Sequence, residues 1–435
     1  MTSAAVSVMV AAGGRRSRLR RAVTRYRSAR RLLRTPASRQ SRNGLDWTNF
    51  FIADIQTGFG TFVAFYLADL GWSEAGVGLA LATGGLAGVV GQIPGGALTD
   101  AVPWKRGLIA AGILMICAAA LIFALAPTFV LVFAAETLHG LSAGVVTPAL
   151  AAVSLGLVGR RAMSVRTGRN FGFAAAGTAL TAGVLGMVGS FVSDRAIFLA
   201  AAVLCAPALI ALSRIRSDEI DYARARNAPT GEHAGRLHRV IDLARNRGLL
   251  LFAACLIFFQ FANASLLPLV SENLGASRAA AGSILISGLI IGPQIVVALL
   301  APWVGYHSET YGRKPLFLIG MGLEAVRAGL FAFVTNYPLM VAIQLLDGIS
   351  GSIINVLTVL VISDLTTGTG RFNLAQGVIG AMVGVAASLS TSITGFIFQE
   401  FGRWAGFIFI AAVAATGTAL ACLLLPETKP EKYPD

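Results

Sequence analysis

The sequence predicts an all-α membrane protein in which 12 transmembrane helices form two pseudo-symmetric six-helix bundles. Three observations support this fold: an apolar composition, apolar runs of membrane-spanning length, and a polar loop that occurs twice. Of the 435 residues, 55% are hydrophobic and only 13% are charged, and the mean hydropathy is +0.72. A soluble domain could not keep so much apolar surface from water, so the composition excludes a soluble globular protein.

Apolar runs of about 20 residues predict the helices, because a helix of that length crosses the hydrocarbon core of a bilayer. Six runs lie before a polar stretch and six lie after it. They cover residues 47–70, 75–99, 107–126, 128–157, 171–192, 196–213, 248–270, 279–304, 315–335, 337–362, 374–398 and 404–425. The predicted domain plan is an arginine-rich, disordered cytoplasmic arm at 1–45, helical bundles at 46–213 and 248–426, a cytoplasmic linker between them at 214–247, and a cytoplasmic tail at 427–435.

The positions of the cationic residues predict the topology. All but four of the 35 Lys and Arg lie in the arm, the linker, the tail or the loops on the same side of the predicted helices. The exceptions are Arg195, Arg278, Arg403 and, inside a helix, Arg327. Since positively charged loops stay in the cytoplasm, both termini are expected inside. The net charge of +14 is thereby explained by topology, and no folded soluble domain remains to bind nucleic acid.

The amino-terminal arm has twelve arginines and no acidic residue within positions 1–43. Organelle transit peptides have such a composition, but a disordered cytoplasmic extension, or a start codon placed too far upstream, is the simpler interpretation. A secretory signal is disfavoured because the weakly apolar stretch 1–12 precedes the cations instead of following them. We therefore expect a multi-pass protein of a bacterial-type inner membrane.

The duplicated loop occurs at 96–106 and again at 305–314, about 209 residues apart. In each copy a glycine lies four residues before a carboxylate, Asp100 or Glu309, and a pair of cations follows. A carrier built from two homologous halves, with its substrate site between them, is the commonest membrane protein with such a repeat.

This plan resembles the major facilitator superfamily over residues from about 46 to 426. The resemblance implies alternating access, with the paired loops latching the cytoplasmic side while the transporter opens outward. Pro103 and Trp104 depart from the family pattern, in which Gly and Arg are usual. The two loop carboxylates can accept hydrogen bonds from exposed amides that open a neighbouring helix. The loop residues assigned to this cytoplasmic gate are Gly96, Asp100, Lys105, Arg106, Gly305, Glu309, Gly312, Arg313 and Lys314.

Charges within a bilayer are costly, so each needs a partner, water or a function. Asp54 in the first helix is the leading candidate for proton coupling, and Asp347 in the tenth is another. Glu136 and His139 lie three positions apart on the fourth helix, where a proton site, a substrate site, a structural pair and a metal site all stay open. Because metal-binding Glu-x-x-His motifs converge in two copies and only one is present, no metal is expected.

Amide side chains supply the candidate substrate contacts. The resemblance implies that the first, fourth, seventh and tenth helices line a central substrate cavity. The candidate substrate-binding residues on these helices are Gln56, Gln260, Asn263 and Gln344. Amide side chains also form hydrogen bonds that hold membrane helices together, so a structural role stays open. Glu324 and Arg327, three apart in the ninth helix, are interpreted as a structural pair in which each charge neutralises the other.

The predicted function is proton-linked export of a small organic compound by a monomeric secondary transporter. Acidic groups outnumber basic ones in the predicted core, and no nucleotide-binding loop is present to use ATP. The alternative is proton-linked uptake of a metabolite or siderophore-like ligand. No interfacial Ser/His or His/Asp constellation indicates an enzyme, and no cofactor is expected. The Gly-Pro pair that many drug–proton antiporters of the family carry in the fifth helix is missing, which disfavours a standard multidrug exporter.

Overall fold

The computed structural model describes residues 37–57, 61–228, 240–275 and 280–430. Within these ranges the chain is helical and has no strand. The helices are α2 (Arg39–Thr57), α3 (Thr61–Asp69), α4 (Glu74–Ala101), α5 (Lys105–Leu125), α6 (Phe129–Val158), α7 (Met163–Phe191), α8 (Asp194–Ser213), α9 (Arg247–Gly275), α10 (Ala280–Tyr311), α11 (Arg313–Phe333), α12 (Tyr337–Leu365) and α13 (Phe372–Leu424). Short 3-10 helices are η1 (Arg160–Ala162), η2 (Ser217–Glu219), η3 (Arg224–Arg226) and η4 (Val240–Arg245).

The predicted all-α membrane fold is confirmed. In the described part of the chain, 9 helices are long and apolar enough to cross a membrane. The first predicted helix corresponds to α2 and α3 together. The last two correspond to α13, which bends at Gly402, where a φ of 81° and a ψ of 172° interrupt the helical backbone. Glycine adopts such a positive φ without steric cost, so the bend occurs there.

The first helix begins at Arg39, inside the segment predicted as a disordered arm. Its opening turns are polar, which hid them from a search for apolar runs, but tertiary contacts hold them. The Ser38 amide donates to Glu219 Oε2 over 2.9 Å, and Leu45 is fully buried. Residues 1–36 of the predicted arm lie outside the described residues.

Side-chain caps start several helices at the positions where the sequence turns polar. Ser73 accepts a hydrogen bond from the Gly76 amide at the start of α4, and Ser193 accepts one from Ala196 at the start of α8. Asn336 caps α12 through the Leu339 amide over 3.1 Å. Each cap satisfies an amide that the helix itself leaves without a partner.

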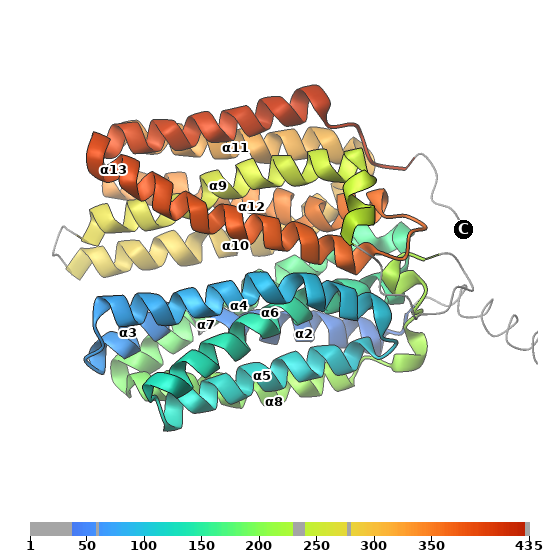
Figure 1. The fold of residues 1–435 in the computed structure, drawn as a ribbon, viewed down its shortest axis with the longest axis horizontal. Coiled ribbons are helices and arrows are strands. Elements are labelled where there is room, and N and C mark those ends of the chain that lie inside the picture. Colours follow the sequence, from blue (N-terminus) through green and yellow to red (C-terminus); the bar gives the residue numbers. More distant parts are fainter. Residues whose placement is uncertain (1–36, 58–60, 229–239, 276–279, 431–435) are drawn as a thin grey trace, which may run out of the picture.

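The helices form two groups that lie side by side, α2–α8 and α9–α13 (Figure 1). Both ends of the described chain and the segment that joins the groups lie at the same end of the molecule, on the right in Figure 1; we call this end the terminal face. A hydrophobic cluster there joins Leu155 and Met163 of the first group to Val304 and Phe317 of the second. The two groups are therefore packed together at the terminal face.

Candidate functional site

The first copy of the duplicated loop links the two groups through Asp100. This residue lies in the last turn of α4 and is 5% exposed. Its carboxylate accepts hydrogen bonds from the backbone amide and the side-chain amide of Asn373, over 3.3 and 2.8 Å, and from the Leu374 amide over 2.8 Å. These amides open α13, so Asp100 caps a helix of the opposite group, where a negative charge is favoured. The cations of this loop stay in their own group: Lys105 donates to the Thr99 carbonyl and Arg106 to Ser217.

The second copy forms an ion-pair network around Arg313, whose side chain is buried. Arg313 pairs with Glu309 over 2.8 Å and with Asp364, in the last turn of α12, over 3.2 Å. Asp364 also pairs with Arg160 of the first group over 3.5 Å. Thus a carboxylate again crosses between the groups, but it comes from α12 and not from the loop itself.

Glycines of both loops allow the helices of opposite groups to touch through their backbones. A Cβ on Gly96 of α4 would overlap the carbonyl of Asn373 in α13. A Cβ on Gly305 of α10 would overlap the carbonyl of Ser164 in α7. Small residues permit such close packing of membrane helices. The four helices α4, α13, α7 and α10 consequently close the terminal face.

A cavity of about 270 Å³ lies between the two groups. One wall comes from α7 of the first group and the others from α9, α10 and α12 of the second. Its polar lining consists of hydroxyl, amide and carboxylate side chains, and its apolar lining includes an aromatic ring. The lining residues are Phe171, Ala174, Ala175, Thr178, Asn263, Pro293, Gln294, Val297, Asp347, Gly351 and Asn355. We call it the central cavity.

Asp347 connects the central cavity to a buried group of charges, which we call the charge cluster: Glu324, Arg327 and Asp347. The Asp347 side chain is 25% exposed and forms an ion pair with Arg327. Arg327 is 1% exposed and also pairs with the fully buried Glu324 over 2.7 Å. It further donates to the amide oxygen of Asn263 over 2.9 Å. The cluster contains two carboxyl groups for one guanidinium, so a proton or a cationic group can complete its charge balance.

The sequence model of the Major Facilitator Superfamily matches residues 46–293 and 249–435. The chain belongs to this family. An uncharacterized MFS-type transporter of Mycobacterium tuberculosis (strain ATCC 25618 / H37Rv) is 36% identical over 387 residues, which are 88% of this chain and 93% of the relative. Shorter matches include the multi-drug resistance efflux pump PmrA of Streptococcus pneumoniae, 29% identical over 159 residues (34% of this chain and 38% of PmrA), and the multidrug transporter protein MdtP of Bacillus subtilis, 28% identical over 110 residues (25% and 20%).

Membership confirms the predicted class of function. The protein is a multi-pass membrane transporter of the major facilitator type with a small-molecule substrate, and it is not an enzyme. In this family the substrate site lies between the two halves, which is where the central cavity is found.

The charge cluster brings together residues of this transporter that the sequence analysis treated separately. Asp347 was a predicted coupling residue and Asn263 a predicted substrate contact, and Arg327 now touches both. Glu324 and Arg327 do form the expected ion pair. The spacing within one helix does not reveal the further contacts of Arg327 with Asn263 of α9 and Asp347 of α12.

The other predicted substrate contacts do not line the central cavity in this conformation. Gln56 in α2 and Gln260 in α9 are half-buried, and Gln344 in α12 is 1% exposed. None of the three is among the residues that line the cavity. The side chain of Asp54, the leading predicted coupling residue, lies outside the described residues.

The carboxylate of Glu136 in α6 is packed against a neighbouring helix. Glu136 is 3% exposed and faces α4, where a Cβ on Gly84 would overlap its Oε2 atom. Its Oε1 atom is buried and has no hydrogen-bond partner among the described residues. Positions three apart differ by about 60° around a helix, which is enough to turn one side chain toward a neighbouring helix. The joint titration of Glu136 and His139 stays a prediction.

Two contacts at the terminal face escaped the sequence analysis. Asp46 in α2 is buried and pairs with Arg166 and Arg169 of α7, the latter over 2.7 Å. Glu427 follows α13 and accepts hydrogen bonds from the Arg313 and Lys314 amides over 2.9 and 3.1 Å, so it caps α11. Asp46 and Glu427 lie at the predicted ends of the helical bundles. A single charge at such a position is typical of a solvent-exposed residue, so nothing in the sequence indicated these contacts.

The Glu427 cap makes a prediction about pH. Partial burial favours the neutral acid, but the amides of Lys429, Arg313, Lys314 and Thr428 donate to the carboxylate and hold the pKa of Glu427 below its ordinary value of 4.5. A carboxyl with a depressed folded-state pKa stabilises the fold above its unfolded pKa, and this contribution is lost as the pH falls through the folded pKa. We expect Glu427→Gln to destabilise the purified transporter by about 1 kcal/mol near neutral pH, as the loss of a helix cap does.

Thermal unfolding at a series of pH values checks this prediction. The difference in melting temperature between Glu427→Gln and the unmodified protein should stay constant down to about pH 5. It should become smaller as the pH falls below that value. Glu400→Gln, at an exposed site in α13, is the control and should leave the melting temperature unchanged. A deficit for Glu427→Gln that persists unchanged at low pH would show that the charge of the carboxylate is not what stabilises the cap.

Proposed function

We propose that this transporter exports a small organic compound in exchange for protons, across the inner membrane, with the terminal face in the cytoplasm. The observation that carries the proposal is the charge cluster, a group of buried ionisable side chains that opens onto the central cavity through Asp347. Ionisable residues inside a membrane protein are costly and mark substrate and proton pathways. The cationic loops at the terminal face support its cytoplasmic placement.

Alternating access follows from the contacts at the terminal face. In this structure Asp100 caps α13, and Gly305 packs against α7 at the same end. Breaking these contacts lets the two groups rock apart and exposes the central cavity to the cytoplasm. Since both groups line the cavity and both come from one chain, a monomer is sufficient for transport.

Exchange requires that the proton and the substrate bind in turn. Asp347 is the member of the charge cluster that reaches the cavity, so the proton and the substrate compete for its carboxylate. When Asp347 is protonated, Glu324 and Arg327 remain as a neutral pair, and the cluster carries no net charge. When it is ionised, the cluster carries one formal negative charge. That charge favours a substrate with a protonated amine.

The lining of the cavity narrows the substrate class further. Amides of Asn263, Gln294 and Asn355 offer hydrogen-bond donors and acceptors, and Phe171 offers an aromatic face. A small polar compound with a cationic end fits this chemistry. The similarity to PmrA, named a multi-drug resistance efflux pump, supports export over uptake. Two sets of residues stay predictions. They are the coupling residues Asp54, Glu136 and His139 and the substrate contacts Gln56, Gln260 and Gln344.

Membrane vesicles with an imposed pH gradient test the direction of transport. We expect everted vesicles that contain the protein and have an acidic lumen to accumulate compounds from a library of small organic amines. Dissipating the gradient with nigericin should release them. Accumulation only in right-side-out vesicles with an acidic exterior would instead identify a proton-coupled importer, the alternative predicted from the sequence. Vesicles from cells without the protein are the control.

A further inference from the structure

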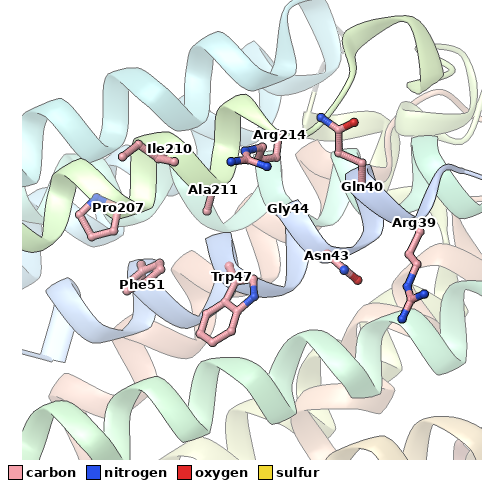
Figure 2. Close-up of a pocket in the computed structure, with 10 residues that line it drawn as sticks. All are labelled: Arg39, Gln40, Asn43, Gly44, Trp47, Phe51, Pro207, Ile210, Ala211 and Arg214. Atoms are coloured by element: carbon pink, nitrogen blue, oxygen red, sulfur yellow. The ribbon is translucent and has the colours of Figure 1, made fainter.

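A groove of about 670 Å³ lies on the lateral surface of the first group, between α2 and α8 (Figure 2). No residue that lines it lines the central cavity, so the transport site does not explain it. The two helices pack closely beneath it: a Cβ on Gly44 would lie 3.0 Å from the carbonyl oxygen of Ala211. We call it the lateral groove.

The lateral groove is polar at one end and apolar at the other. Figure 2 shows Arg39 and Asn43 at the end nearest the terminal face, and Phe51 and Ile210 at the opposite end, with Arg214 beside Gly44 between them. Arg39 and Phe51 are twelve residues apart on one helix, which corresponds to about 18 Å along its axis. Half of a bilayer has a hydrocarbon layer of about 15 Å beneath its head groups. The groove therefore matches one leaflet in length and in the order of its chemistry.

The charge of the groove is positive and unbalanced. Arg39 and Arg214 are both exposed, and neither guanidinium forms a hydrogen bond or ion pair with a described residue. Two other arginines nearby are paired with carboxylates: Arg169 with Asp46 and Arg216 with Asp218. No acidic residue lines the groove. An anionic ligand complements the two free cations, and guanidinium groups suit phosphate oxygens well.

Trp47 lies in the wall of the groove between the polar and apolar ends. Its side chain is 48% exposed, yet aromatic neighbours fix it: the ring stacks on Phe51 with centroids 5.9 Å apart and meets Phe50 edge-on at 5.3 Å. Tryptophan concentrates at the boundary between head groups and acyl chains. Its position divides the groove into a head-group part and an acyl-chain part.

We propose that the lateral groove is a binding site for an anionic phospholipid. Arg39 and Arg214 contact the phosphate-bearing head group, and an acyl chain lies along Trp47, Phe51 and Ile210. A free phosphate would use the arginines but leave the apolar part of the groove in contact with bulk lipid. A zwitterionic phospholipid would fill the groove but carry its own cation toward the two arginines.

Native mass spectrometry of the full chain in a nonionic detergent tests the site. The probes are phosphatidylglycerol, phosphatidylcholine with the same acyl chains, deacylated glycerophosphoglycerol, and inorganic phosphate. We expect phosphatidylglycerol alone to form a saturable 1:1 complex. Because each basic residue near a membrane surface contributes about fivefold in affinity for anionic lipid, Arg39→Gln and Arg214→Gln should each weaken binding about fivefold, and the double variant roughly 30-fold.

Arg247→Gln is the matched control, because Arg247 opens α9 as Arg39 opens α2 and is exposed at the same face of the molecule. It should leave the affinity for phosphatidylglycerol unchanged. The melting temperature of each variant without lipid confirms that it is folded. Any of three results would overturn the proposal. They are a loss of phosphatidylglycerol affinity in Arg247→Gln equal to that in the groove variants, phosphatidylcholine binding as tight as that of phosphatidylglycerol, and undiminished binding of phosphatidylglycerol to the double variant. Binding of the deacylated compound or of phosphate with the affinity of the intact lipid would identify a soluble anion as the ligand instead.

Discussion

Asp347→Asn is expected to reduce gradient-driven transport to the level of empty vesicles and to slow substrate exchange without abolishing it, because the ionised carboxylate also attracts the cationic end of the substrate. Asparagine has the shape of the carboxyl group but cannot carry a proton. The substitution also keeps the cluster electrically balanced, because Arg327 remains paired with Glu324 over 2.7 Å and bonded to Asn263. The protein should therefore fold, with coupling lost and substrate exchange slowed.

Proteoliposomes separate these two activities. Uptake driven by a pH gradient measures coupling, and exchange of labelled for unlabelled substrate without a gradient measures binding and the conformational change. Glu324→Gln is the matched control. This substitution also leaves Arg327 with one carboxylate partner, Asp347. Unlike Asp347, Glu324 is fully buried and does not line the central cavity. We expect it to retain most of its coupling.

Two outcomes would contradict this assignment. Full accumulation of substrate by Asp347→Asn would show that another group carries the proton, with the predicted Asp54 as the first to test. Equal loss of coupling in Glu324→Gln would show that the ion pairs of the cluster, and not Asp347 in particular, are required. Arg327→Gln is not a useful variant, because it leaves two buried carboxylates without a cation, which costs several kcal/mol.

The sequence was sufficient to predict the helices and the class of protein because both depend on local or repeated features. A span of apolar residues identifies a membrane helix without knowledge of its neighbours. The duplicated loop likewise placed Asp100 at a helix end, where an amide partner from another helix was expected, and Asn373 and Leu374 supply it. Polar helix ends are less visible, which is why the opening turns of α2 at Arg39 were assigned to the arm.

The proposed transport site was only partly predictable because it depends on which helix faces which. Asp347 and Asn263 were selected as polar residues within predicted helices, but their connection through Arg327 arises from the packing of α9, α11 and α12. The same argument explains Glu136: its spacing from His139 is a property of one helix, whereas its contact with Gly84 is a property of two. Asp364 was passed over for a similar reason, since its partners Arg313 and Arg160 are far away in sequence.

Gly305→Leu should slow transport strongly by favouring the open terminal face. A Cβ at Gly305 would overlap the Ser164 carbonyl and lie 3.0 Å from the Cα of Gly168, so the obstacle is backbone, which cannot rotate away. Overpacking of this kind costs about 1–3 kcal/mol, which lowers the population of the closed state roughly 5- to 150-fold. We expect this contact to be broken in the open state, so the substitution should not destabilise that state.

The accessibility of the central cavity reports this shift. With the native cysteines replaced, a cysteine at Ala174 lines the cavity and should react with a membrane-impermeant maleimide from the terminal-face side much faster in Gly305→Leu than in the parent. Gly322→Leu is the control, because nothing lies within 4 Å of a Cβ at that position of α11, and it should leave both transport and labelling unchanged. Labelling in Gly305→Leu at the rate of the parent would mean that the contact of α10 with α7 persists in both states. Gly305 would then contribute only to helix packing. Closure of the terminal face would depend on the contact between α4 and α13, which includes Asp100.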